Sequence, residues 1–331
     1  MKVAVVGGGS FGTAMACAAR RAGLDVTIWA REPEVVESIN VQSINPLFLK
    51  GIPLERGIVA HSSLEQAVAA ADFVLLAVPA QFLRAIAAQM RSALRPGVPV
   101  VSCSKGIEQN TCALMPEVIA QTTPEATVAV LAGPSFAAEV ALGLTTAVTL
   151  ACTDQVTAER LAKALTSEHF RVYTSSDPVS ATIGGAFKNV LAIACGIAIA
   201  RKMGENMRGL LIARGLSEMC RIAHAKQGDP FNLLGLAGCG DVTLTCMGTQ
   251  SRNTSFGIAL GEGRSAADIL AERKVVTEGV HNAASITELG RRLRVPVPIA
   301  NAVNTIVNQS GAIDDAFQAL LAEPAGPELF R

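Results

Sequence analysis

Residues 3–14 read VAVVGGGSFGTA, and the glycines in this stretch are flanked by two contrasting patterns. Val3–Val6 is a short apolar run that is typical of a buried strand. The small residues of Thr13–Gly23 favour a helix. The stretch therefore predicts a strand, a glycine-rich turn and a helix in direct succession.

The glycines of this turn occupy the three places of the pattern G-x-G-x-x-G. Gly7 permits the tight turn, Gly9 lets the backbone approach a pyrophosphate, and Gly12 lets the helix pack closely against the strand. The N-terminus of the helix offers unpaired N–H groups to the same anion. The alternative, a glycine turn without a ligand, does not explain why all three glycines are in register. The pattern predicts that the chain binds a dinucleotide.

The composition excludes several classes of partner. The chain has 331 residues, which suggests two domains, and 50% of them are hydrophobic. The formal net charge is zero and no basic stripe appears, so we expect no nucleic-acid partner. The eight cysteines form no C-x-x-C pair and the four histidines are dispersed. We therefore expect reduced thiols, a cytoplasmic protein and no metal site.

One apolar run, Ile183–Ala200, is long enough to be considered as a membrane span. Lys188, Asn189 and two glycines interrupt it, and these favour a buried helix of a folded domain. We expect no membrane span and no signal peptide.

The order of patterns along the chain indicates two domains. Residues 1–177 alternate apolar strand patterns with helical ones, which predicts a doubly wound, mostly parallel sheet of the Rossmann type. Strands are expected at 3–6, 26–29, 73–78, 99–102, 128–131, 147–151 and 170–173. Asp177 and Pro178 suit the start of a helix, and residues 178–331 show helical periodicity only. We therefore expect an α/β dinucleotide-binding domain followed by an all-helical substrate-binding domain.

The second expected strand ends in Trp29-Ala30-Arg31. A carboxylate at this place usually bonds the adenine ribose of NAD, whereas a guanidinium suits the 2′-phosphate of NADP. Arg31 therefore favours NADP, with use of NAD retained. The alternatives are that Arg31 is an ordinary surface residue, or that the adjacent Glu32 weakens the preference.

Further motifs identify a family. Taken together with the glycine loop, they resemble the NAD(P)-dependent glycerol-3-phosphate dehydrogenases of the bacterial, soluble type over nearly the whole chain. The motifs are NPLFL at 45–49, VPAQ at 78–81, SKGIE at 104–108, GPSFAAE at 133–139, GGAFKNV at 184–190, GCGD at 238–241 and QSRN at 250–253. The resemblance implies reversible reduction of dihydroxyacetone phosphate to sn-glycerol 3-phosphate, which starts glycerophospholipid synthesis. It also implies a Rossmann-type domain followed by a helical one.

The resemblance also implies roles for individual residues. Lys188 matches the catalytic lysine and Lys105 the second active-site lysine. From the residues themselves, we expect Asp241 to act with them by accepting a hydrogen bond from Lys188 or from a substrate hydroxyl, the alternative being that Asp241 caps the next helix. Substrate contacts match Lys105, Gly133, Ser135, Lys188, Asp241, Ser251, Arg252 and Asn253. Cofactor contacts match Gly7, Gly9, Ser10, Phe11, Gly12, Arg31, Lys105, Ala137, Arg252, Val276 and Glu278. Thr277 is an extra residue relative to many members, which makes Val276 and Glu278 the least secure assignments.

The chemistry of Lys188 is consistent with this role. Reducing a ketone builds negative charge on its oxygen, and a lysine whose pKa is lowered by burial can donate the proton. Gly184 and Gly185 precede Lys188 by four and three residues and share its helical face, so we expect them to leave room for a substrate. The alternative is a lysine that reaches solvent beside glycines that merely permit close helix packing.

Two further segments suit a phosphorylated substrate. Ser251 is expected to cap a helix whose first turn carries Arg252 and Asn253, an arrangement that favours a phosphate. Lys105 and the loop at Gly133–Ser135 each follow a strand, at the edge where such sheets bind ligands.

Two other functions remain open from the residues alone. One is another two-domain reductase, of the 3-hydroxyacyl-CoA or ketopantoate type. The other is an inactive NADPH-sensing module, which the joint presence of Lys105, Lys188, Asp241 and Arg252 disfavours. A homodimer is compatible with the chain, but no residue pattern specifies it.

Overall fold

The computed structural model describes residues 1–248, 250–273 and 276–322, and it divides the chain into two compact units. The first unit comprises Met1–Ser104 and Met115–Pro178, and the second comprises Lys105–Leu114 and Val179–Arg331. The expected division was 1–177 and 178–331, so the segment Lys105–Leu114 belongs to the second unit although its neighbours in sequence belong to the first.

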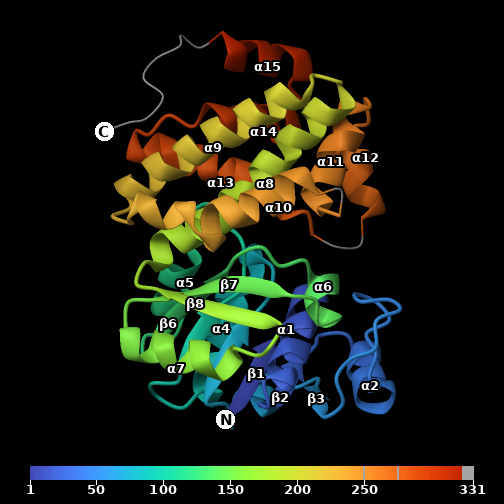
Figure 1. Ribbon diagram of the computed structural model, residues 1–331, viewed down its shortest axis with the longest axis vertical. Helices are drawn as coiled ribbons and strands as arrows, with labels where there is room; N and C mark the ends of the chain where they lie inside the picture. The colour runs from blue at the N-terminus through green and yellow to red at the C-terminus, as the bar shows by residue number, and fades with distance from the viewer. Residues whose placement is uncertain (249, 274–275, 323–331) are drawn as a thin grey trace. The chain divides into compact units, whose positions relative to one another are not determined.

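The first unit is built on one eight-stranded sheet (Figure 1). Its order is β3-β2-β1-β4-β5-β6-β7-β8, and all neighbours are parallel except β6 and β7. The strands are β1 (Lys2–Val6), β2 (Asp25–Trp29), β3 (Ile58–His61), β4 (Phe73–Leu76), β5 (Val100–Ser102), β6 (Val128–Ala132), β7 (Thr146–Cys152) and β8 (Phe170–Ser175). The predicted doubly wound, mostly parallel sheet is confirmed, with β3 as a strand that the sequence did not reveal.

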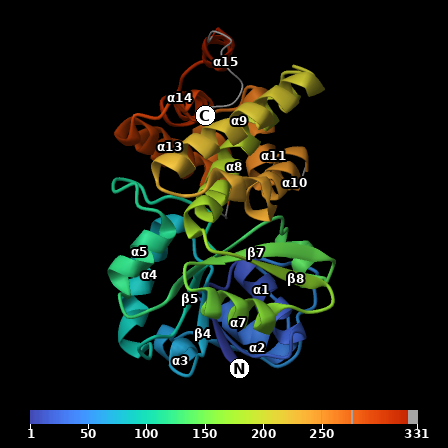
Figure 2. The same cartoon turned by 60° about the vertical axis from the view of Figure 1, so that its left-hand side comes forward.

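Helices cover both faces of this sheet. They are α1 (Ser10–Arg21), α2 (Pro33–Gln42), α3 (Leu64–Val68), α4 (Leu83–Met90), α5 (Met115–Thr122), α6 (Ala137–Ala141) and α7 (Gln155–Leu165), with short 3-10 turns η1 (Ala80–Phe82) and η2 (Arg91–Ala93). Helices α1 and α6 pack together, and α4 packs on α5 on the other side of the sheet (Figure 2). Val3 and Val5 of β1 share one core with Met15 of α1, which fixes the turn between this strand and helix.

Apart from the segment Lys105–Leu114, which has no helix, the described part of the second unit is helical. Its elements are α8 (Pro178–Ala200), α9 (Glu205–Ala225), η3 (Pro230–Leu234), a single π turn η4 (Leu236–Gly240), α10 (Asp241–Met247), α11 (Arg252–Gly261), α12 (Ala266–Glu272), α13 (Glu278–Leu293), α14 (Pro298–Asn308) and α15 (Ile313–Leu321). The predicted all-helical domain is confirmed. Helices α10 and α15 are additions to the expected set.

Helix α8 is the core helix of the second unit. It is long and apolar enough to cross a membrane by length and composition, but 89% of its most apolar window is buried within the fold. Phe187, Val190 and Leu191 are fully buried in the core that α8 shares with its neighbours. This burial is typical of the central helix of a globular unit.

One buried carboxylate in this unit caps a helix. Glu218 of α9 is fully buried and accepts hydrogen bonds from the backbone N–H groups of Ile299 (2.8 Å) and Ala300 (3.4 Å) at the start of α14. Burial raises the pKa of Glu218 to about 8, although the two N–H groups act in the opposite direction.

Candidate functional site

The glycine loop between β1 and α1 has the three properties that its sequence predicts. Gly7 has φ +122°, and a Cβ there would lie 2.5 Å from the Ala77 carbonyl oxygen. A Cβ on Gly12 would lie 1.9 Å from the Gly7 carbonyl oxygen, so only glycine lets α1 start this close to the strand. A Cβ on Gly9 would meet no protein atom within 4 Å. The first and third glycines serve the fold, while the second leaves open space above the backbone.

No side chain caps α1. Its N-cap is Gly9, and no side-chain hydrogen bond closes the terminus. The Ser10 hydroxyl instead donates to the Phe48 carbonyl oxygen (2.8 Å). Ser10 can therefore contribute its backbone to an anion at this terminus more readily than its hydroxyl.

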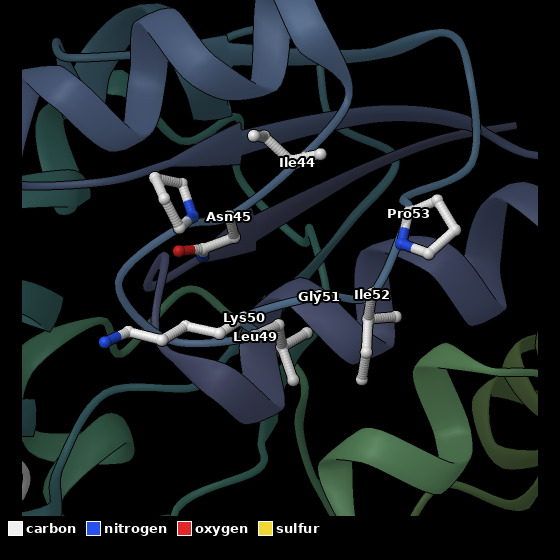
Figure 3. A pocket seen from close by; sticks show the side chains of 8 residues that line it. Ile44, Asn45, Leu49, Lys50, Gly51, Ile52 and Pro53 are labelled. Carbon is white, nitrogen blue, oxygen red and sulfur yellow. The ribbon is translucent and has the colours of Figure 1, made fainter.

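The glycine loop is supported by the segment that follows α2. The Asn45 side-chain amide is buried and donates to the Gly8 carbonyl oxygen (2.9 Å) and to the Thr13 hydroxyl (2.8 Å). Residues 44–46 and 49–53 line a hollow of about 420 Å³ on this segment, where the Lys50 amine points away from Pro53 (Figure 3). The NPLFL motif thus acts as a brace for the glycine loop.

Arg31 lies just after β2, as predicted. Its side chain is 79% exposed, and its Nε and Nη2 atoms both bond Glu32 Oε1 (3.1 and 2.8 Å). The guanidinium is at the expected place, but the adjacent carboxylate competes for it.

Gly133, Ser135 and Ala137 lie where β6 passes into α6. The Ser135 hydroxyl donates to the Gly133 carbonyl oxygen (2.9 Å), which tightens this turn. Strands β1 and β6 run parallel in the sheet, so this turn and the glycine loop follow the same edge. Phe11 and Ala137 pack against the same core.

The second unit brings Lys105, Lys188 and Asp241 together. Lys188 Nζ donates to Asp241 Oδ1 (2.5 Å), and Lys105 Nζ donates to Asp241 Oδ2 (2.8 Å). The side chain of Asp241 is fully buried, while those of Lys188 and Lys105 are 9% and 16% exposed. One carboxylate is thus shared by two ammonium groups, which leaves the cluster with an excess of positive charge.

The environment of Lys188 tunes its acidity. The pKa of Lys188 is lowered to about 8, chiefly by burial; the nearby Lys105 acts in the same direction, and Asp241 opposes both effects. Lys188 Nζ also donates to the Thr245 hydroxyl (2.9 Å). Thr245 was not predicted as a site residue. Its spacing of four from Asp241 could have suggested it, had the helix α10 been expected.

The expectation that Gly184 leaves room for a substrate is wrong. A Cβ on Gly184 would lie 2.2 Å from the Ala237 carbonyl oxygen, so this glycine admits another part of the protein to α8. A Cβ on Gly185 would make only an ordinary contact with Lys105 Cγ, at 3.6 Å, and the expectation for Gly185 stays a prediction. Gly184 brings η4 close to α8, and this contact places the start of α10 and its Asp241 opposite Lys188.

Buried amides surround the Lys105 backbone. Its carbonyl oxygen accepts from the side-chain amides of Asn189 (3.2 Å) and Asn282 (3.0 Å). Asn253 Nδ2 donates to Asn189 Oδ1 (2.9 Å), and Asn253 Oδ1 accepts from the Gly279 N–H (3.0 Å). Asn253, a predicted substrate contact, therefore ties α11 to α8 and α13.

The predicted phosphate site lies at the start of α11. Ser251 caps this helix, accepting from the Thr254 N–H (3.2 Å), as expected. Arg252 is exposed, and its Nη1 donates to the Val276 carbonyl oxygen (3.4 Å). Glu278, the first residue of α13, interacts electrostatically with Arg252. Val276 and Glu278 thus lie beside Arg252 in the second unit.

No cluster of three or more metal-ligating side chains occurs among the described residues. The candidate site of the second unit instead consists of cations: a buried pair of lysines around one carboxylate, and an exposed arginine at a capped helix terminus. Such a set can bind an anionic ligand and transfer a proton near neutral pH.

Comparisons with known proteins match nearly the whole chain. The family model for the N-terminus of NAD-dependent glycerol-3-phosphate dehydrogenase matches residues 2–158, and the model for the C-terminus matches residues 177–318. A protein of Parvibaculum lavamentivorans named glycerol-3-phosphate dehydrogenase (NAD(P)+) is 48% identical over 98% of this chain and 97% of its own. One of Rhodospirillum rubrum with the same name is 47% identical over 97% of this chain and 92% of its own. The crystal structure of glycerol-3-phosphate dehydrogenase from Coxiella burnetii superposes with a TM-score of 0.93 at 33% identity, covering 97% of this chain and 99% of that one.

Proposed function

Because this chain belongs to the NAD-dependent glycerol-3-phosphate dehydrogenase family, we propose that it catalyses the reversible, NAD(P)H-dependent reduction of dihydroxyacetone phosphate to sn-glycerol 3-phosphate. The observation that carries the proposal is the shared carboxylate of Asp241, which holds the Lys188 and Lys105 ammonium groups together in a buried cluster. The cluster supplies the acid that ketone reduction needs.

The residues of the glycine loop fit a dinucleotide. The open space above Gly9 and the uncapped N-terminus of α1 form a cradle that a side chain at position 9 would fill. When bound, the nicotinamide dinucleotide supplies the hydride. Gly7, Gly9, Gly12 and the backbone of Ser10 and Phe11 would hold its pyrophosphate, and Ala137 of α6 would border it. Arg31 would favour NADP, with NAD as the second carrier.

Lys188 would donate the proton to the substrate oxygen. A pKa of about 8 leaves most of the Lys188 amine protonated at neutral pH, yet makes it a stronger acid than an exposed lysine. In the reverse reaction, the neutral amine of Lys188 would accept the proton of the secondary alcohol.

Lys105 and Asp241 would support this transfer. The Lys105 ammonium lies on the same carboxylate and would hold the negative charge that develops on the ketone oxygen. Asp241 keeps the two cations close together and offsets part of their repulsion. Thr245 fixes the direction of the Lys188 amine by accepting one of its protons.

Arg252 would bind the substrate phosphate. The first turn of α11 combines a Ser251 cap, a helix N-terminus and a guanidinium that reaches solvent. A dianionic phosphate gains charge-assisted hydrogen bonds from such a set. Ser251 and Asn253 shape this terminus, and Gly133 and Ser135 remain proposed contacts from the first unit.

The wider setting follows from the product. We propose that the glycerol 3-phosphate formed feeds glycerophospholipid synthesis in the cytoplasm, which accords with eight free cysteines in the described residues. A homodimer is the assembly that we propose to test.

The decisive experiment compares initial rates with NADH and NADPH on dihydroxyacetone phosphate, ketopantoate and a 3-ketoacyl-CoA. We expect rapid oxidation of the reduced carrier with dihydroxyacetone phosphate only, and faster turnover with NADPH. Turnover confined to either alternative substrate would replace the proposed reaction. Binding of NADPH without turnover of any substrate would indicate a sensing module.

A further inference from the structure

The backbone at Lys105 lies outside any helix or strand. Residues 103–106 follow β5 without regular structure. The position of the Lys105 ammonium therefore depends on what holds its own peptide group. Two buried side-chain amides do so, because Asn189 and Asn282 both donate to the Lys105 carbonyl oxygen.

Asn282 makes a second bond that ties this peptide group to the helix of Lys188. Its Nδ2 atom donates to the carbonyl oxygens of Lys105 and Ala186, each at 3.0 Å. Ala186 precedes Lys188 by two residues on α8. Since both partners are acceptors, the amide must present its nitrogen to them. One side chain on α13 thus bridges the two backbones that carry the lysines.

This arrangement leaves one polar atom unsatisfied. Asn282 is fully buried, and its Oδ1 atom has no hydrogen-bond partner within the described residues. An unpaired buried acceptor lowers stability, so a residue chosen for packing alone would be apolar here. The two donated bonds, and the geometry that they impose, account for an amide at this position.

We propose that Asn282 is a positioning residue for the reaction, which holds the Lys105 carbonyl at a fixed distance from α8 and so keeps both ammonium groups on Asp241. This inference rests on the proposed function of the lysine cluster. Without Asn282, the Lys105 carbonyl oxygen loses one of its two amide donors and keeps the other, Asn189. Its ammonium then moves relative to Lys188, and the charge that stabilises the developing oxyanion is misplaced.

The test uses Asn282→Leu in the full-length protein, with Asn304→Leu as the matched control. Leucine keeps the number and branching of the side-chain heavy atoms and removes both donated bonds. Asn304 of α14 is also a buried amide, and its side chain accepts from Asn308. We measure the pH profile of kcat/KM for dihydroxyacetone phosphate, which reports groups of the free enzyme, together with the thermal midpoint.

For Asn282→Leu we expect kcat/KM to fall roughly ten- to hundredfold, as displacement by about 1 Å does in other sites. The alkaline limb should move to higher pH, because Lys105 no longer opposes protonation of Lys188. The thermal midpoint should not fall. A loss of activity with an unmoved limb and a lower midpoint would indicate a merely structural role and overturn the inference, as would an unchanged kcat/KM.

A second variant and a second readout keep the result decisive. Asn282→Ser retains a polar group too short to reach both carbonyls, and we expect a smaller shift in the same direction. Trace acetylation of Lys188 against pH, read by mass spectrometry, tests the same shift without turnover. If the wild type does not reduce dihydroxyacetone phosphate, the proposed function fails. If the wild type is active and the acetylation midpoint of Lys188 is the same in wild type and variants, only the role of Asn282 fails.

Discussion

The glycine loop and the lysine cluster are suited to binding anions in opposite ways. The loop removes side chains: it exposes backbone N–H groups and leaves space above Gly9. The cluster instead buries three charged side chains, which lie on segments far apart in sequence. The loop therefore depends on local geometry, whereas the cluster depends on the folding of the whole second unit. A substitution in the loop should change activity by filling the space that a ligand needs. A substitution in the cluster should change activity by altering the balance of buried charges.

The largest effect should come from removing the proposed acid. In Lys188→Met, we expect turnover to fall by at least about a hundredfold, in line with the loss of general acid catalysis. The fold should persist, because Asp241 keeps Lys105 as a partner. Steady-state rates measure the loss, and NADPH fluorescence titration should show unchanged binding. Turnover near that of the wild type would remove Lys188 from the mechanism.

Two alanine substitutions in the loop should distinguish an effect on the stability of the fold from an effect on ligand binding. Gly12→Ala places a methyl group against the Gly7 carbonyl, and we expect it to destabilise the protein by about 1–3 kcal/mol. Gly9→Ala meets no protein atom, so its denaturation midpoint should equal that of the wild type. Its affinity for NADPH should nonetheless weaken tenfold or more, a loss of about 1.4 kcal/mol. Equal NADPH affinity in Gly9→Ala and the wild type would show that the pyrophosphate lies elsewhere.

Removing the proposed phosphate ligand should change binding more than chemistry. For Arg252→Ala, we expect the KM for dihydroxyacetone phosphate to rise by roughly ten- to hundredfold, since a hydrogen bond to a charged group contributes about 1.5–3 kcal/mol. The kcat value at saturation should change less. Inorganic phosphate, as a competitive inhibitor, should lose affinity in parallel. An unchanged KM together with unchanged inhibition by phosphate would contradict the assignment.

Glu218 is a buried titratable group outside the lysine cluster. Its pKa of about 8 in the folded state exceeds its ordinary value, so the stability that it contributes is complete at acidic pH and is lost as pH rises through about 8. Glu218→Gln removes this dependence while keeping an acceptor for α14. As pH rises from about 5 to about 8.5, the thermal midpoint of the variant should therefore increase relative to that of the wild type. Parallel curves would show that Glu218 does not titrate there.

The smallest effect concerns the choice of carrier. Glu32→Gln releases Arg31 from an exposed ion pair, and such pairs contribute no more than about 1 kcal/mol. We expect the preference for NADPH over NADH, as a ratio of kcat/KM values, to rise by up to about fivefold. Arg31→Ala should lower the same ratio. If both variants keep the wild-type ratio, this strand end does not select the carrier.

The sequence predicted the loop better than the cluster, for physical reasons. The geometry of the loop depends only on residues that are neighbours in sequence, and its glycines form a recognisable motif. Strand β3 was missed because it is short and half of its residues face outward, and α10 was missed because Val242, Thr243 and Thr245 are β-branched residues, which disfavour helices. The hydrogen bond between Lys188 and Asp241 was predicted as one of two options, but the geometry that forms it requires the close approach of η4 to Gly184.

Among the amides around Lys105, Asn282 had no sequence signal at all. Asn282 lies 177 residues from the carbonyl that it holds, and the acceptor is a backbone atom that every residue has. A hydrogen bond of this kind leaves no pattern in residue types. The part of a site that rests on main-chain acceptors therefore becomes visible only in three dimensions.

The segment Lys105–Leu114 has a consequence for biosynthesis. It leaves the ribosome with the strands of the first unit, yet Asn189 and Asn282, which hold its first carbonyl, follow 84 and 177 residues later. Since chains fold from the N-terminus during synthesis, this segment must wait for most of the helical unit to emerge. The same connectivity matters for chimaeras: a helical unit exchanged between two relatives from residue 179 onward would meet a foreign lysine segment, so residues 105–114 must be exchanged with it.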